Sequence, residues 1–188
     1  RENGERIPPD FAQMILENLK TAGVQQAHKE DKIIFTALIP WPGELICAEG
    51  QYNEGGNQGG REKRAGIFIG PEFGTVTRPD LVQAGREAAE AGFDVLIACA
   101  FNYDAHSTEF SKLGRLQVLK ARMNADLHMA DDLKNTGKGN LFVIFGEPDI
   151  QLHYCDGGEI RVQVMGVDVF HPGTGEVRSD GPEGIACW

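Results

Sequence analysis

The feature that most restricts the fold is an almost uninterrupted apolar run at residues 93–101, with the sequence FDVLIACAF. A strand with one face in water alternates apolar and polar side chains, and this run does not alternate. Such a run is typical of a strand in a sheet that is covered on both faces. We therefore expect residues 93–101 to form a central strand of a layered α/β domain.

A strand and a helix that precede this run complete a βαβ unit. Thr77 at a capping position and Pro79 in the first turn indicate the start of a helix over residues 77–91, and Gly92 indicates its end. Residues 65–69, before the helix, are apolar enough for a buried strand. Two parallel strands joined by a crossover helix have this order of elements.

The remaining chain predicts flanking structure on both sides of this unit. Apolar residues recur at helical spacing over residues 8–22, which indicates a helix. A further helix is expected at residues 125–134, and further strands at residues 33–39, 44–52, 63–69, 116–121 and 141–145. Residues 150–154 and 160–164, around the glycines at 157 and 158, predict a β-hairpin. The expected fold class is α/β, with a mixed sheet, a central βαβ unit, flanking helices and a C-terminal antiparallel hairpin.

Length and composition narrow the class of protein. A chain of 188 residues favours a single α/β domain, here residues 7–188, after a polar tail at residues 1–6 that we expect to be disordered. The apolar stretch at residues 184–188 indicates a piece of a longer protein. The four cysteines form no Cys-x-x-Cys pair, and no apolar stretch is long enough to span a membrane. A cytoplasmic protein without a membrane partner is expected.

The charge balance bears on nucleic-acid binding. Acidic residues outnumber basic ones by 28 to 18, which gives a net charge of -10. A protein that coats DNA without specificity needs a cationic surface, so this class is not expected here. A compact basic patch remains compatible with the sequence, and its best candidates are Arg61, Lys63 and Arg64.

Polar clusters follow four of the expected strands and suggest one catalytic possibility. Ligands of open parallel sheets bind beyond the carboxyl ends of the strands. If all four strands are parallel, their following carboxylates converge on one edge, where they could hold Mg²⁺ and a water for hydrolysis. The candidate metal ligands are Glu72, Asp104, Asp126, Glu147 and Asp149, with His106 nearby. The alternative is that these polar residues cap the helices that follow the strands, as Asn124 could do.

A second pattern also points to a metal-dependent nuclease. The order helix, three strands, helix, strand over residues 8–101 resembles the core of restriction endonucleases. Those enzymes place an acid on the second strand, a position that Glu49 could occupy, and an acid-x-lysine on the third. The third strand here offers Glu62-Lys63-Arg64-Ala65, which is not a clean match. A similar pattern at Pro148-Asp149 and Glu159-Ile160-Arg161 spans the expected hairpin and has Arg in place of the lysine that orients water, so we interpret it as chance. The histidines at 28, 128, 153 and 171 have no evident partner in the sequence.

Several longer strings resemble one family. They are IFIGPEFGTV at residues 67–76, the run at residues 92–106, ARMNADL at residues 121–127 and GNLFVIFGEPD at residues 139–149, with shorter strings at residues 167–170 and 180–188. Together they resemble the C-terminal half of large adenine-specific DNA methyltransferases that serve as methylation subunits of type III restriction-modification systems. The resemblance runs from about Ile7 to the end of the chain.

The resemblance implies a parent protein that methylates adenine with S-adenosylmethionine. The two motifs that such enzymes need, an Asp-Pro-Pro-Tyr type motif and a Phe-x-Gly-x-Gly motif, are both missing from this sequence. We therefore expect no catalytic residue and no cofactor site in this chain. The leading hypothesis is a non-catalytic accessory domain that positions DNA or a restriction subunit for the methyltransferase. The alternative is a metal-dependent, nuclease-like or hydrolase-like α/β domain that uses the carboxylates at the strand ends.

Overall fold

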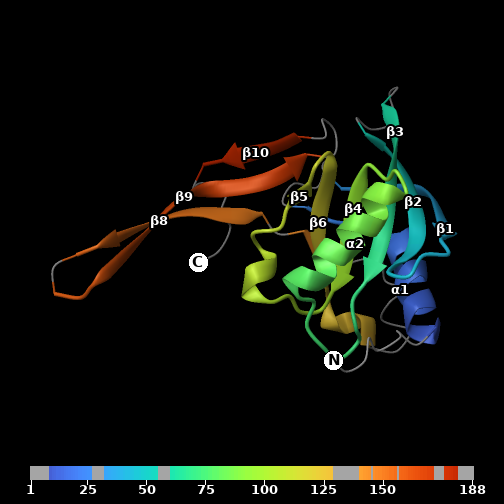
Figure 1. Cartoon of the computed structure of the whole chain (residues 1–188), viewed down its shortest axis with the longest axis horizontal. Helices are drawn as coiled ribbons and strands as arrows, with labels where there is room; N and C mark the ends of the chain where they lie inside the picture. The colour runs from blue at the N-terminus through green and yellow to red at the C-terminus, as the bar shows by residue number, and fades with distance from the viewer. Residues whose placement is uncertain are drawn as a thin grey trace.

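A computed structural model describes residues 9–26, 32–54, 60–128, 140–144, 146–155, 157–171 and 176–181. Most of these residues belong to one layered body, from which a smaller sheet projects (Figure 1). The elements of the body are α1 (Pro9–Ala22), β1 (Phe35–Pro40), β2 (Ile46–Glu54), β3 (Arg61–Ile69), α2 (Arg78–Glu90), β4 (Val95–Ala100), η2 (Ala105–Ser107), β5 (Lys112–Leu113), β6 (Leu116–Met123), η3 (Ala125–His128) and β7 (Phe142–Ile144). The smaller sheet consists of β8 (Glu147–Tyr154), β9 (Ile160–His171) and β10 (Glu176–Asp180).

The body is built on a mixed sheet of seven strands. Its order is β1-β2-β3-β4-β6-β5, and β7 also pairs with β6. Strands β1, β2 and β3 form an antiparallel meander, whereas β4 runs parallel to both β3 and β6. The expected fold class is confirmed, including the βαβ unit of β3, α2 and β4.

The central strand β4 is covered on both faces, as its sequence predicts. All six of its residues are buried. Its alternate side chains enter two different cores: Val95, Ile97 and Cys99 pack in the core that contains α1, whereas Leu96, Ala98 and Ala100 pack in the core that contains α2. The two helices therefore cover opposite faces of the sheet, and α2 lies in front of it in Figure 1.

Both helices begin and end where their sequence signals lie. Thr77 caps α2, and its backbone N–H donates to the Asp80 side chain at 2.8 Å. This contact satisfies one polar group at the helix start with a carboxylate that also favours the positive end of the helix dipole. Gly23 follows α1 with φ 66°, and Gly92 follows α2 with φ 73°, a backbone conformation that glycine adopts without strain.

Strand β7 does not run in the direction that would bring the carboxyl ends of all four expected strands to one edge of the sheet. Strand β7 runs antiparallel to β6, because Phe142 at its start lies opposite Met123 at the end of β6. A strand that begins beside the end of its neighbour must run back along it. The expected helix at residues 125–134 begins with the 3-10 turn η3, and its remainder lies outside the described residues, as do the tail at residues 1–6 and the apolar end at 184–188.

The C-terminal sheet has the order β10-β9-β8 and is entirely antiparallel. The predicted hairpin is confirmed: β8 and β9 pair from Glu147 to Tyr154, and Gly157 and Gly158 both have positive φ in the turn. Figure 1 shows this hairpin extending away from the seven-stranded sheet. No helix within the described residues is long and apolar enough to cross a membrane.

Candidate functional site

The carboxyl edge of the parallel strands carries three of the five candidate metal ligands. Glu72 follows β3, Asp104 follows β4 and Asp126 follows β6. A parallel bridge between Val76 and Tyr103 ties the first two segments together beyond the sheet. Since β3, β4 and β6 are parallel, these three carboxylates lie at the same edge, as expected.

In each of the three segments that follow β3, β4 and β6, a polar side chain is engaged in a contact within the fold. Asp104 Oδ1 accepts a hydrogen bond from the backbone N–H of Ser107 at 2.7 Å and so caps η2. The backbone N–H of Asp126 donates to Asn124 Oδ1 at 3.0 Å, which places Asn124 in the capping role that the sequence allowed. Glu72 Oε1 lies 3.4 Å from His128 Nδ1. His106 is exposed on η2. These contacts fit the capping alternative better than a metal site.

The other two candidates do not share this edge, so the expected convergence of all five is wrong. Because β7 turns back along β6, the chain leaves the carboxyl edge before it reaches β8. Glu147 then pairs with Asp168, and Asp149 pairs with Gly166, both in the C-terminal sheet. Among the described residues, no three Asp, Glu, His or Cys side chains are grouped so that they could hold a metal ion.

His128, which has no evident partner in the sequence, lies in an aromatic stack at the same edge. Its ring is stacked on Phe101 with centroids 4.5 Å apart and on Phe73 with centroids 6.0 Å apart. The ring thus joins the segments that follow β3, β4 and β6. Sequence spacing gave no signal for this, because the three residues are far apart in the chain.

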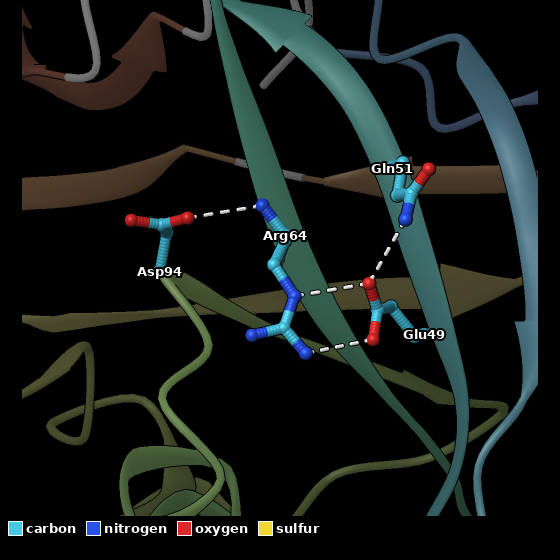
Figure 2. A network of polar contacts seen from close by, with 4 residues as sticks. All are labelled: Glu49, Gln51, Arg64 and Asp94. Atoms are coloured by element: carbon cyan, nitrogen blue, oxygen red, sulfur yellow. Dashed lines mark hydrogen bonds and ion pairs between the residues drawn. The ribbon is translucent and has the colours of Figure 1, made fainter.

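A polar network joins β2 and β3 instead (Figure 2), and it lies beside Phe93, on the face of the sheet whose core contains α2. Arg64 of β3 forms a two-pronged ion pair with Glu49 of β2: Nε donates to Oε1 at 3.0 Å and Nη2 donates to Oε2 at 2.8 Å. Gln51 Nε2 donates to the same Oε1 at 3.1 Å. Two parallel N–H···O bonds are the strongest form of this pairing.

Aromatic rings and a second carboxylate hold Arg64 from its other sides. The guanidinium lies over the Phe93 ring, 4.9 Å from its centroid, and 6.0 Å from that of Trp41. The backbone N–H of Arg64 donates to Asp94 Oδ2 at 3.0 Å. Asp94 is the one charged residue within the apolar run at 93–101, and this irregularity is the signal that could have identified it from the sequence.

The electrostatics follow from this geometry. Hydrogen bonds from Arg64 lower the pKa of Glu49, although burial of the carboxylate acts in the opposite direction. The same hydrogen bonds raise the pKa of Arg64. The Glu49 side chain is 11% exposed and the Arg64 side chain is 39% exposed, so the carboxylate is shielded from water while the guanidinium stays partly solvated. Elsewhere, burial raises the pKa of the Cys47 thiol to about 11, which makes it a poor nucleophile at neutral pH.

The candidate DNA contacts divide between this network and a neighbouring cavity. Arg64 is engaged by Glu49, and Lys63 lies 3.5 Å from Glu54 and 3.8 Å from Asp94. Arg61 and Lys63 line a cavity of about 560 Å³ at the opposite edge of the sheet from Glu72, together with Arg115, which sequence reasoning missed. Glu54 and Asp94 line the same cavity, so its charge is nearly balanced.

The comparisons with known proteins add no relative. No family model matches the chain, and neither a curated protein nor a solved structure is similar to it. What the site can do must therefore be argued from its chemistry. Where Glu49 on β2 faces Arg64 on β3, the guanidinium binds both carboxylate oxygens, which is the arrangement of an ion pair rather than of a receptor for a metal ion.

Proposed function

We propose that this chain is a non-catalytic accessory domain of an adenine-specific DNA methyltransferase of a restriction-modification system, in which it positions DNA or a restriction subunit. The observation that carries the non-catalytic part is the fork between Arg64 and Glu49. A catalytic carboxylate directs an oxygen lone pair at a metal ion, a water or a substrate. Glu49 presents both of its oxygens to Arg64 and one of them also to Gln51.

Two of the remaining acidic candidates support the same reading. Asp104 caps η2 through a hydrogen bond of 2.7 Å, and Glu72 contacts His128. Groups committed to such contacts hold the segments that follow the strands in place. The identity of the parent enzyme rests on the sequence strings that resemble type III methylation subunits. Its expected cofactor, S-adenosylmethionine, would bind elsewhere in the parent protein, and the expected setting is the bacterial cytoplasm.

The direct test is a methylation assay on the product of the whole reading frame that encodes this chain. We expect that product to transfer methyl groups to adenine in duplex DNA and to carry both motifs that this chain lacks. The isolated chain should neither methylate DNA nor bind S-adenosylmethionine in a calorimetric titration. A matched control changes the Asp of the Asp-Pro-Pro-Tyr type motif, which should abolish transfer. Micromolar binding of S-adenosylmethionine by the isolated chain would contradict the proposal.

A second candidate, a metal-dependent nuclease, is favoured by one observation. The order α1-β1-β2-β3-α2-β4, with a meander followed by a parallel strand, agrees with the expected resemblance to the restriction-endonuclease core. The test is incubation of plasmid DNA with the chain and Mg²⁺ or Mn²⁺, beside an Asp104→Ala variant. Cleavage by the original chain that is lost on Glu49→Gln would favour the nuclease. Under the accessory proposal, neither Mg²⁺ nor Mn²⁺ supports cleavage by the chain. Neither ion raises the melting temperature of the original chain more than it raises that of the Asp104→Ala variant.

A further inference from the structure

The C-terminal hairpin has one face that is made entirely of apolar side chains. Three directly opposed pairs across β8 and β9 form it: Ile150 with Val164, Leu152 with Val162, and Tyr154 with Ile160. We refer to these six side chains as the hairpin face. Side chains alternate between the two faces of a strand, so the neighbours of these residues lie on the other face. That face is polar, with Gln151 opposite Gln163 and His153 opposite Arg161.

The hairpin face is not covered by the rest of the described chain. Ile150, Leu152, Ile160 and Val162 are between 47% and 57% exposed, and Tyr154 is 81% exposed. None of the six belongs to either of the two cores. Single exposed apolar residues are ordinary, but a contiguous apolar patch marks a binding surface. A projecting two-stranded hairpin also gains little stability by itself in water.

We propose that the hairpin face is a homodimer interface and that its occupant is the same face of a second copy of this chain. The exposed side chains together present on the order of 600 Å² per copy, so two faces together reach the lower bound of about 1,200 Å² for stable protein interfaces. The face contains no charged side chain between residues 150 and 154 or between 160 and 164. The six side chains of one copy can therefore pack against the six of the other, as the faces of two sheets do, with no charged side chain among them.

The ends of the hairpin are complementary in shape. In a two-fold arrangement the tip of one hairpin lies over the base of the other. At the base, Ile150 and Pro148 line an open cavity of about 490 Å³, together with Tyr103 and the charged side chains of Glu109, Lys120 and Arg122. At the tip, Tyr154 is the most exposed side chain of the hairpin face. A large ring at one end and a cavity of sufficient size at the other make the surface self-complementary.

The charges of the hairpin and of the chain argue against a DNA duplex or an anionic lipid surface as the occupant of the hairpin face. A DNA duplex needs a cationic surface, and the polar face of the hairpin offers Arg161 as its one permanent cation among residues 150–154 and 160–164. The net charge of -10 also disfavours an anionic lipid surface. In a dimer, by contrast, the projecting hairpins hold the two acidic bodies apart.

The test is sedimentation equilibrium of the full chain at several concentrations. We expect a monomer–dimer equilibrium with a dissociation constant in the micromolar range. Leu152→Glu should weaken dimerisation on the order of a hundredfold, because it places an unpaired charge at the centre of the interface. Gln151→Glu adds the same charge on the opposite face of the same strand and should leave the dimer intact.

Tyr154→Ala gives a second measurement that does not depend on how Leu152→Glu folds. This side chain is mostly exposed, so its removal should preserve the melting temperature of the body while it weakens dimerisation at least tenfold. A chain that stays monomeric at about 100 µM would overturn the proposal. So would equal dimerisation of the original chain and both variants, or flotation of the monomer with phosphatidylcholine vesicles.

Discussion

Arg64 is held by contacts of three kinds, each of which acts on a different part of the residue. Glu49 binds two of its guanidinium nitrogens, the Phe93 ring packs against the flat side of the guanidinium, and Asp94 accepts from its backbone N–H. A lysine could supply the charge but neither the fork nor the flat surface. The sequence placed Arg64 among possible DNA contacts because its charge is visible in the sequence and its partners are not. Pairing across strands that are 15 residues apart in the chain depends on register, which sequence patterns define poorly.

The first prediction concerns this ion pair. Glu49→Gln should lower the free energy of unfolding by about 1–2 kcal/mol at pH 7, because it replaces two charge-assisted hydrogen bonds with weaker ones and Arg64 remains partly solvated. Arg64 lowers the pKa of Glu49, so the carboxylate stabilises the fold above the unfolded value of 4.5, and this stabilisation is lost as the pH falls through the folded pKa.

The difference between the original chain and Glu49→Gln should therefore shrink as the pH drops below about 4.5. Urea titrations between pH 7 and pH 3.5 measure it. Glu62→Gln, on the exposed part of β3, is the matched control and should change little at any pH. An equal difference at both ends of this pH range would count against the ion pair as its source.

At the scale of elements, the parts with strong local signals were predicted well. The apolar run at 93–101 became β4, and the caps of α2 lie where Thr77 and Gly92 indicated. The direction of β7 was not predictable, because it is a strand of three residues whose pairing is set by distant contacts with β6. That one direction decided the candidate site, since a parallel β7 would have carried Glu147 to the edge that Glu72 and Asp104 share.

Helix α2 contains a glycine that the packing does not require. A Cβ added at Gly85 would lie 3.4 Å from Leu113 Cδ2 and 3.4 Å from Phe110 Cζ, which is ordinary van der Waals contact. Glycine in a helix interior costs backbone entropy relative to alanine. Gly85→Ala should therefore raise the free energy of unfolding by about 0.5–1 kcal/mol in urea titrations.

Gly70 provides the opposite case for the same substitution. A Cβ there would lie 2.5 Å from Val76 Cγ2 and 3.0 Å from Ala100 Cβ, both on buried residues. Gly70→Ala should lower the free energy of unfolding by about 1–3 kcal/mol because the close packing beyond β3 must shift. The reverse order of the two variants in stability would show that the packing around α2 differs from this account.

At the scale of the whole molecule, charge limits what the chain can bind alone. The cations that line the cavity at the amino edge of the sheet, Arg61, Lys63 and Arg115, share it with Glu54 and Asp94. With a net charge of -10, we expect no gel shift of duplex DNA at submicromolar protein in about 150 mM salt. Any binding at low salt should weaken on Arg61→Ala. A shift that survives about 150 mM salt would contradict this prediction and would point to a compact basic patch, for which Arg61, Lys63 and Arg64 are the best candidates.

The two sheets should also differ in how easily they open. Strands β3 and β4 lie between two cores, whereas none of the described side chains of β8 and β9 belongs to either core. Backbone amides with few buried apolar contacts exchange through local opening at low free-energy cost. In hydrogen-exchange measurements on a dilute sample, we expect the amides of β8 and β9 to exchange at least tenfold faster than those of β4.

The same experiment at high concentration links this difference to the hairpin face. Dimerisation covers Leu152 and its neighbours, so the amides of β8 and β9 should become more protected as the concentration rises, while those of β4 stay unchanged. Leu152→Glu should exchange at the dilute rate at every concentration. If β8 and β9 were as protected as β4 in the dilute sample, the second sheet would owe its stability to contacts within one copy. The monomer would then have no need of a partner to hold the hairpin in place.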